Sequence, residues 1–391
     1  MLQKIKILTI IGTRPQIIKA SAISRTIKKY HKDTIQEIIV HTGQHYDANM
    51  SEVFFKELQI PQPNYDLKVG SGTHGVQTAE MIKGIEEIIL KEKPDCMVLY
   101  GDTNSTLAGA IAASKLHCKI VHIEAGLRSY NKTMPEEINR ILCDHCSTLL
   151  FSPTQTGYNN LIKEGFIKNN QPPFSADNPK IYHCGDIMYD NTLHFSEIAS
   201  KKSEILKKNN LKKNTYALAT IHRDNNTDNP KRLSSIFKAM LSIAENKNID
   251  FVIPLHPRTA KILKENLFTD VYNQLILSKH IRIIEPVSFL DMIELEQNSI
   301  LVVTDSGGVQ KEAYFLQKPC IILRPQTEWV ELTEHGSSII ADADKVKIIN
   351  AANILLANNT INFPPIFGNG KAADFICEEL LNNFGNTAKD I

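Results

Sequence analysis

The chain has 391 residues, 42% of them hydrophobic, and a formal net charge of +1. A single hydrophobic core rarely supports this length, so we expect two α/β domains. The near-zero charge provides no field for binding nucleic acid or an anionic membrane surface, and no apolar run is long enough to span a bilayer.

The N-terminal half alternates between predicted strands and helices. A β-branched run from Ile5 to Ile11 predicts the first strand, and the pattern over residues 15–30 predicts the first helix. Further strands, each preceded by a helical segment, are predicted at residues 35–43, 95–101, 119–126 and 148–154. Repeated strand–helix units specify a parallel, doubly wound sheet, which we assign to a Rossmann-like domain over residues 1–173.

A second series of strands follows residues 169–180, a segment rich in Pro and Asn that we predict to be a loop. Its strands are predicted at residues 180–186, 216–223, 251–257, 281–287, 300–308 and 320–326. They define a second Rossmann-like domain over residues 180–370. The last helical segment, residues 371–391, can pack on either domain, and we assign it to the first. Two such domains facing each other form a cleft suited to a sizeable ligand.

Three acidic residues, Asp102, Glu124 and Glu136, stand at the ends of apolar runs between Val98 and Pro153. An acid directly after a buried strand lies at the carboxyl edge of the sheet, where open α/β folds bind their ligands. Carboxylates gathered in one cleft push their pKa values apart, so that one can stay protonated while another acts as a base. Each acid also has an ordinary explanation, as a turn former, a helix-dipole partner or a first-turn helix residue. Together they indicate acid–base chemistry.

Two glycine-containing turns are typical of anion-binding sites. Gly12 and Arg14 follow the first strand, where a helix N-terminus and a guanidinium can hold a diphosphate. Ser306, Gly307 and Gly308 follow a later strand and open a helix, which Ser306 can cap while the glycine amides bind phosphate oxygens. For the first of these, the alternative is an ordinary strand-to-helix turn with a surface arginine.

The seven cysteines are scattered and mostly lie in apolar runs, which favours reduced, packed thiols in a cytoplasmic protein. Cys143 and Cys146 form a CxxC pair inside a helical pattern, without a second pair to complete a zinc site. No GxGxxG motif follows a strand, and no His/Cys cluster has the spacing of metal ligands, so we expect neither a nicotinamide cofactor nor a metal.

A series of motifs along the chain resembles one enzyme family, the non-hydrolysing UDP-N-acetylglucosamine 2-epimerases. In order, these motifs are GTRPQIIK (12–19), HTGQH (41–45), YGDTNSTLAGA (100–110), HIEAGLR (122–128), MPEEINR (134–140), HR (222–223), PLHPR (254–258) and TDSGGVQKEA (304–313). The resemblance covers nearly the whole chain. The segments HRDNNTDNP and RSYNKTMPEEINRIL are more similar to the branch that acts on a 2,3-diacetamido-glucuronic acid nucleotide than to the housekeeping enzyme.

The resemblance implies inversion of C2 in an N-acetylated hexose linked to UDP. UDP leaves C1 as the C2–H bond breaks, giving a 2-acetamidoglycal, and adds back after a proton arrives on the opposite face. The implied catalytic residues are Asp102, Glu124, Glu136 and His222, with acid and base left unassigned among the carboxylates. The implied contacts to the UDP-sugar are Arg14, Gln44, Arg140, Arg223, His256, Phe289, Ser306, Gly307, Gly308, Glu312 and Arg324.

Two of these contacts have a more specific implied role. Glu312 accepts hydrogen bonds from the vicinal ribose hydroxyls, and His256 lies near the diphosphate. Without the resemblance, Glu312 is equally an acid that stabilises the start of its helix. A lone strand-end histidine such as His256 is more often structural than functional.

The chain also departs from the family pattern. Gln16 stands where the family has an acid, so any charge at this position is lost. Tyr46 and Asp47 replace an arginine and a glutamine that help several bacterial members to bind a second substrate molecule as an activator. We therefore expect no substrate activation. The EAGLR sequence differs from that of the hydrolysing relatives, which disfavours release of the sugar.

Two other classes of protein remain open. A UDP-sugar glycosyltransferase of the same GT-B-like architecture shares the nucleotide contacts but needs an acceptor groove. A non-catalytic UDP-sugar sensor needs none of the acids. We expect a homodimer that binds a UDP-sugar, with no cofactor, nucleic acid or membrane partner.

Overall fold

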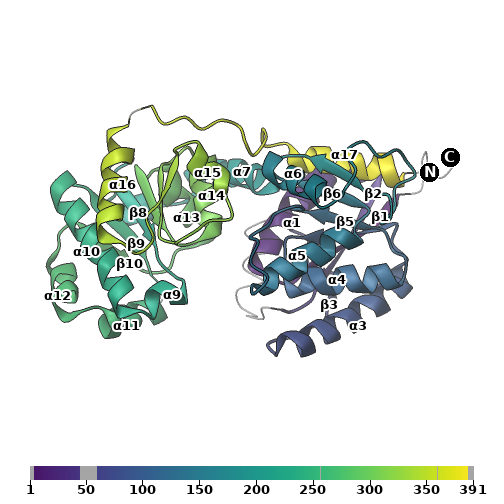
Figure 1. Ribbon diagram of the computed structural model, residues 1–391, viewed down its shortest axis with the longest axis horizontal. Coiled ribbons are helices and arrows are strands. Elements are labelled where there is room, and N and C mark those ends of the chain that lie inside the picture. Colours follow the sequence, from purple (N-terminus) through teal and green to yellow (C-terminus); the bar gives the residue numbers. More distant parts are fainter. Residues whose placement is uncertain (1–3, 45–59, 256, 359, 386–391) are drawn as a thin grey trace. The chain divides into compact units, whose positions relative to one another are not determined.

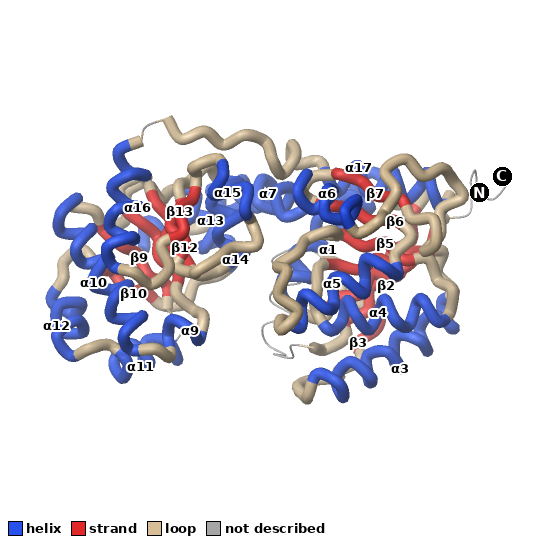
Figure 2. Tube along the Cα trace, in the orientation of Figure 1, coloured by secondary structure: helices blue, strands red, loops and turns tan. Residues whose placement is uncertain are grey.

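A computed structural model of the protein describes residues 4–44, 60–255, 257–358 and 360–385. The chain forms two compact units (Figure 1). Unit 1 comprises Met1–Asn191 and Pro365–Ile391, and unit 2 comprises Thr192–Pro364. Each unit is a parallel sheet flanked by helices (Figure 2), so the predicted pair of doubly wound, Rossmann-like folds is confirmed.

The sheet of unit 1 has seven parallel strands in the order β3-β2-β1-β4-β5-β6-β7. The strands are β1 (Ile5–Ile11), β2 (Ile35–His41), β3 (Tyr65–Asp66), β4 (Cys96–Tyr100), β5 (Ile120–Ile123), β6 (Leu149–Ser152) and β7 (Lys180–His183). The central strands read as continuous apolar runs because helices cover both faces of the sheet. β1 pairs with β2 in register from Ile5↔Ile35 to Ile11↔His41.

The helical elements described in unit 1 are α1 (Arg14–Thr26), η1 (Ile27–His31), α3 (His74–Glu92), α4 (Asn104–Lys115), α5 (Pro135–Cys146), α6 (Gln155–Lys163), the start of α7 (Ile187–Lys202) up to Asn191, and α17 (Ala372–Phe384). The rest of α7 belongs to unit 2. α3, α4 and α5 form one layer, visible in Figure 1. Leu8 and Ile10 of β1 point into the core beneath this layer, where they pack with Met81 and Ile85 of α3. α1 packs beside α17.

The sheet of unit 2 has six parallel strands in the order β10-β9-β8-β11-β12-β13. They are β8 (Tyr216–Thr220), β9 (Asp250–Pro254), β10 (Ile281–Ile284), β11 (Leu301–Thr304), β12 (Cys320–Ile322) and β13 (Ser338–Ile340). The helices are α8 (Ile205–Lys208), α9 (Asp224–Thr227), α10 (Pro230–Lys247), α11 (Pro257–Asn266), α12 (Thr269–Leu277), α13 (Phe289–Gln297), α14 (Gly307–Phe315), α15 (Val330–Glu334) and α16 (Lys345–Ala357). α10 and α16 pack together over the main core.

The strand expected to open the second domain belongs instead to unit 1. β7 pairs in parallel with β6, with Phe151 opposite Tyr182. The rings of these two residues stack at a centroid distance of 4.8 Å, and Phe375 of α17 packs edge-on against both. This aromatic cluster fixes β7 and the C-terminal helix to the first sheet. The expected boundary between residues 173 and 180 therefore moves to Asn191, within α7.

Two further expectations concern segments outside the sheets. The Pro- and Asn-rich segment at 169–180 contains no helix and joins β7 only at its last residue, as predicted. Among the residues that the structure describes, no helix has the length and apolar character needed to cross a membrane.

Candidate active site

Each sheet reverses its strand order at one point near its centre. β2 and β4 flank β1 in unit 1, and β9 and β11 flank β8 in unit 2. The crevice outside the carboxyl ends of such strands is where open α/β folds bind their ligands. Most of the described residues expected at a site lie at one of these two places, and each place is described on its own below.

Asp102 lies just after β4 in unit 1 and is paired with Arg140 of α5. The Nη2 atom of Arg140 contacts Oδ2 of Asp102, and its Nη1 lies 2.8 Å from Oε2 of Glu137. Burial opposes the charge of Arg140, but Asp102, Glu137 and Glu124 outweigh it and raise the pKa of the guanidinium. Arg140 is therefore a permanent cation that orients Asp102.

Glu124 follows β5 and adopts a left-handed backbone conformation with φ of +77°. This conformation is costly for a residue with a side chain and is often found at functional positions. The peptide N–H groups of Glu124 and Ala125 both donate to the carbonyl of Phe151 at 3.0 Å, which holds the turn in place. The Glu124 carboxylate is mostly buried and forms an ion pair with Nζ of Lys19 on α1.

Lys19 was not predicted as a site residue, although it lies in the first family motif. The sequence did carry a signal, because Lys19 follows two isoleucines and precedes an alanine in a largely buried helix. A lysine on such a face requires an anionic partner. The identity of that partner, Glu124, depends on the fold.

Glu136 is exposed in the first turn of α5, directly after Pro135. It lies four residues before Arg140 and therefore on the same face of the helix. The neighbouring Glu137, unlike Glu136, is buried. It accepts hydrogen bonds from the backbone N–H groups of Ser129 and Tyr130, both at 2.9 Å. These bonds and Arg140 lower the pKa of Glu137 despite its burial. Glu137 is thus structural.

The turn after β1 is held by Gln16 of α1, at the position where the family has an acid. Its Oε1 accepts the N–H of Gly12 at 2.9 Å, and its Nε2 donates to the carbonyl of Tyr100 at 3.0 Å. The amide provides the acceptor and the donor for these two bonds without carrying a charge. A Cβ atom on Gly12 would lie 2.1 Å from Oγ1 of Thr42, so this turn requires glycine. Arg14 is exposed in the first turn of α1.

Gln44 lies beside the start of α4. Its Oε1 accepts hydrogen bonds from the backbone N–H and the hydroxyl of Ser105, at 3.0 and 2.7 Å. The side chain therefore satisfies a backbone donor at a helix N-terminus. Its expected contact with a ligand remains a prediction.

In unit 2, a buried carboxylate holds His222 and Arg223 at the end of β8. Asp305, at the end of β11, accepts the backbone N–H groups of His222 and Arg223 at 3.0 and 3.1 Å. It also accepts Nδ2 of Asn226 at 3.0 Å. The side chains of His222 and Arg223 are exposed. Asp305 lies in the TDSGGVQKEA motif but was not predicted as a site residue. Its partners follow a different strand, β8, so their pairing is evident only in the fold.

The helix α14 begins at Gly307, one residue beyond Ser306, which follows Asp305. Ser306 caps it as predicted, with its Oγ accepting the N–H of Val309. The carboxylate of Glu328 lies against Gly307, where an added Cβ would come within 2.5 Å of Oε1. Arg324 forms an ion pair with Glu328, with Nη1 2.9 Å from Oε2. These contacts bring Ser306, Gly307 and Arg324 together.

Two further expected residues lie in the surrounding helices of unit 2. Glu312 is half-buried in α14, and its charge together with burial raises the pKa of the fully buried Glu296 well above its ordinary value. Phe289, at the start of α13, is buried edge-on against Phe195 with ring centroids 5.2 Å apart. His256, Tyr46 and Asp47 lie outside the described residues.

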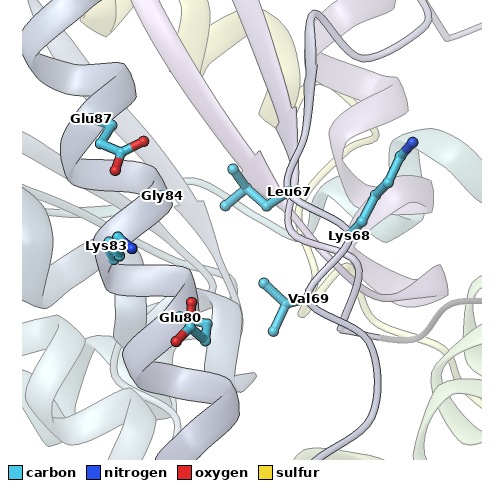
Figure 3. Close-up of a pocket in the computed structure, with 7 residues that line it drawn as sticks. All are labelled: Leu67, Lys68, Val69, Glu80, Lys83, Gly84 and Glu87. Carbon is cyan, nitrogen blue, oxygen red and sulfur yellow. The ribbon is translucent and has the colours of Figure 1, made fainter.

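A polar cavity of about 400 Å³ lies between the segment after β3 and α3 (Figure 3). Its lining residues are Leu67, Lys68, Val69, Glu80, Lys83, Gly84 and Glu87. Lys68 extends away from α3 in this view. None of the lining residues is an expected site residue, and their charges are mixed.

Comparisons with known proteins agree over almost the full chain. A family model described as UDP-N-acetylglucosamine 2-epimerase matches residues 28–381. A UDP-N-acetylglucosamine 2-epimerase homolog of Methanococcus maripaludis is 48% identical over 380 residues, covering 96% of this chain and 99% of that protein. The UDP-2,3-diacetamido-2,3-dideoxy-D-glucuronate 2-epimerase of Pseudomonas aeruginosa is 48% identical over 375 residues, with coverage of 96% and 99%.

Solved structures give the same result. The crystal structure of Methanocaldococcus jannaschii UDP-GlcNAc 2-epimerase, in complex with UDP-GlcNAc and UDP, is 44% identical to this chain. The match covers 97% of this chain and 100% of the Methanocaldococcus jannaschii chain, with a TM-score of 0.81. The Neisseria meningitidis enzyme bound to UDP-GlcNAc is 28% identical, with a TM-score of 0.79 and coverage of 97% and 100%.

Proposed function

Because this chain belongs to the UDP-N-acetylglucosamine 2-epimerase family, we propose that it inverts C2 of a UDP-linked N-acetylated hexose without hydrolysing it. The observation that carries this proposal is the group of paired acids at the switch point of the first sheet. Asp102 with Arg140 and Glu124 with Lys19 are two carboxylates, each ordered by its own cation. A nucleotide sensor or a simple UDP-binding domain has no need of this arrangement.

The reaction has to break a C2–H bond that is not acidic, because no carbonyl is adjacent to C2. Departure of UDP from C1 removes this difficulty, since the electrons of the C2–H bond then form the C1–C2 double bond of a 2-acetamidoglycal. UDP adds back to C1 while C2 receives a proton on the opposite face. The route needs a base on one face, an acid on the other and cations for the departing diphosphate.

We assign the acid and base roles to Asp102, Glu124 and Glu136. Asp102 and Glu124 are supported by their ordered ion pairs, and Glu136 by its position one turn before Arg140. His222 and Arg14 assist the departure of the diphosphate. The presence of Lys19 beside Glu124 places a mobile proton donor next to a carboxylate, which suits a group that changes protonation during the reaction.

The nucleotide is bound by unit 2 in this proposal. Ser306, Gly307 and Gly308 provide the N-terminus of α14 for phosphate oxygens, and Arg324 adds a cation at the same helix end. Glu312, further along the same helix, accepts hydrogen bonds from the ribose hydroxyls. Arg223 and Phe289 complete the contacts to UDP.

Two substrates fit this family equally well. One relative at 48% identity acts on a 2,3-diacetamido-glucuronate nucleotide, and a UDP-N-acetylglucosamine 2-epimerase of Methanocaldococcus jannaschii is 46% identical over 374 residues. The sequences around Asn131 and Asn225 favour the diacetamido-glucuronate branch. We further propose that the enzyme is cytoplasmic, which its seven unpaired cysteines support, and that it serves surface-polysaccharide synthesis, which this branch supports. Its assembly as a homodimer stays a prediction.

The test is to incubate the protein with each UDP-sugar and follow C1 and C2 of the product by NMR. The proposal expects the C2 epimer still linked to UDP, at an equilibrium reached from either side. Accumulation of a reducing sugar and UDP identifies a hydrolysing 2-epimerase instead. Turnover that requires an added sugar acceptor identifies a glycosyltransferase.

A further inference from the structure

His122 of β5 is a fully buried histidine whose two ring nitrogens both have hydrogen-bond partners. Nε2 lies 2.8 Å from the carbonyl oxygen of Gly101, and Nδ1 lies 2.7 Å from Oδ1 of Asp144 on α5. A carbonyl oxygen can only accept, so Nε2 carries a proton. Asp144 is also an acceptor when ionised, so Nδ1 carries the second proton. His122 is therefore an imidazolium in this arrangement.

The pKa values of both groups agree with this charge state. Burial lowers the pKa of His122, but Cys143 and Asp144 outweigh it and raise the pKa well above its usual value. Burial raises the pKa of Asp144, but the opposing effect of His122 and Arg128 is larger, so the pKa lies below its usual value. The pair is thus an internal imidazolium–carboxylate ion pair.

Asp144 also holds the next turn along the sheet. Its Oδ2 accepts the backbone N–H of Gly126 at 3.1 Å and lies 2.7 Å from Nη1 of Arg128. Arg128 in turn forms two hydrogen bonds of 2.6 Å with the carboxylate of Glu164. All the polar groups of this buried cluster are paired, which favours a single geometry.

The cluster connects the backbone segments that carry two of the proposed acids. Gly101, whose carbonyl binds His122, directly precedes Asp102, and Gly126, whose N–H binds Asp144, lies two residues after Glu124. Gly101, Glu124 and Gly126 all have left-handed backbone conformations, with φ of +63°, +77° and +80°. One buried carboxylate therefore reaches both turns, one directly and one through His122.

We propose that His122 and Asp144 are positioning residues that hold the turns carrying Asp102 and Glu124 at a fixed separation for proton transfer. A neutral imidazole has one N–H and can satisfy only one of its two acceptors, so the second proton is what links the two turns. Asp144 and Arg140 both lie on α5, four residues apart. The same helix therefore also orients Asp102 directly, through the ion pair of Arg140 with Asp102. Displacements of about 1 Å at reacting groups cost rates of about 100-fold.

The test, which rests on the proposed epimerase activity, uses H122Q and D144N. Glutamine keeps one donor without the charge, and asparagine keeps the shape of Asp144 without the carboxylate. We expect kcat, expressed per UDP-binding site, to fall about 10- to 100-fold in each variant, with KM and the Kd for UDP within two-fold of the original. Because the UDP contacts are assigned to unit 2, circular dichroism and thermal unfolding of each variant check separately that unit 1 stays folded. D144E restores the carboxylate and is expected to recover part of the lost kcat.

Unit 2 provides a matched control. His280 and Asp250 form a second His–Asp pair at 2.9 Å, and Arg282 contacts the same aspartate. This cluster is at the start of β9, away from the carboxyl ends of the strands, so H280Q and D250N are expected to leave kcat unchanged. The inference is overturned if H122Q and D144N keep kcat within two-fold, or if they lose it only in proportion to UDP binding. Absence of C2 epimerisation in the original protein instead refutes the proposed function.

Discussion

At the scale of single residues, the proposed acids differ in how the chain holds them. Asp102 and Glu124 are each ordered by a buried or half-buried cation, whereas Glu136 is exposed at a helix N-terminus. Burying an ion pair costs desolvation energy, so these two pairs are weak sources of stability. Their evident effect is to fix the positions of the Asp102 and Glu124 carboxylates. The catalytic assignment therefore makes a direct prediction for all three positions.

The amide variants D102N, E124Q and E136Q are each expected to reduce kcat by roughly two to four orders of magnitude, since each removes a group that transfers a proton. The affinity for UDP is expected to stay close to that of the original protein, because the nucleotide contacts are assigned to unit 2. Steady-state kinetics and calorimetric titration with UDP measure both quantities. E80Q, at an exposed acid on α3, is the control. Retention of turnover in all three variants would remove the acid–base assignment.

Glu296 leads to a prediction about pH and stability. Its carboxyl is fully buried, and burial together with the charge of Glu312 raises its pKa well above 4.5. The folded protein then binds this proton more tightly than the unfolded chain does. Above the unfolded pKa, this group therefore lowers the stability of the folded protein as the pH rises, by up to about 1.4 kcal/mol per pH unit.

The E296Q variant removes this titration while keeping the shape of the side chain. It is expected to match the original protein in denaturant unfolding near pH 4 and to become more stable than it as the pH rises to 8. E245Q, at an exposed glutamate of α10, serves as the control and is expected to show no such trend. A stability difference that is constant across this pH range would show that Glu296 is not protonated in the folded protein.

At the scale of elements, the turns after the strands carry the site. In both units, a turn after a strand is held by a buried carboxylate from a different element: Asp144 of α5 holds the turn after β5, and Asp305 at the end of β11 holds the turn after β8. The first glycine of α14 shows how closely such turns are packed. An added methyl at Gly307 meets Glu328 at 2.5 Å, whereas one at Gly308 meets nothing closer than 3.8 Å.

The pair G307A and G308A tests this packing. G307A is expected to be less stable than G308A by up to about 1 kcal/mol, because the methyl group displaces the end of the Glu328 side chain and its ion pair with Arg324. G308A is expected to be neutral or slightly stabilising, because alanine is favoured over glycine in a helix by about 0.5–1 kcal/mol. Chemical denaturation measures both. Equal effects at the two positions would mean that Glu328 does not pack against Gly307.

The sequence predicted the alternation of strands and helices well, because each central strand is a β-branched apolar run followed by a turn signal. It placed β7 in the wrong unit, because the pairing of Tyr182 with Phe151 is a tertiary contact that no local pattern encodes. The acids at strand ends were predictable from position alone. Their partners Lys19 and Arg140, and the carboxylates of Asp144 and Asp305, approach from other elements and become evident only in the fold.

At the scale of the whole molecule, the chain combines two doubly wound units with different chemistry. Unit 1 carries the ordered acids, and unit 2 carries the helix N-terminus and cations suited to a diphosphate. This division predicts that changes to the acids affect proton transfer without affecting nucleotide affinity. The family comparisons support the same reaction along almost the full length of the chain.

The central claim is that the enzyme breaks and reforms the C2–H bond of a UDP-sugar, and the most direct measurement is isotope incorporation. UDP-N-acetylglucosamine and the diacetamido-glucuronate nucleotide are incubated separately with the protein in deuterated water and analysed by NMR. The account predicts deuterium at C2 of the epimer and, on prolonged incubation, of the substrate, for at least one of the two nucleotides. Epimer formed with hydrogen retained at C2, or no exchange with either nucleotide, would contradict it.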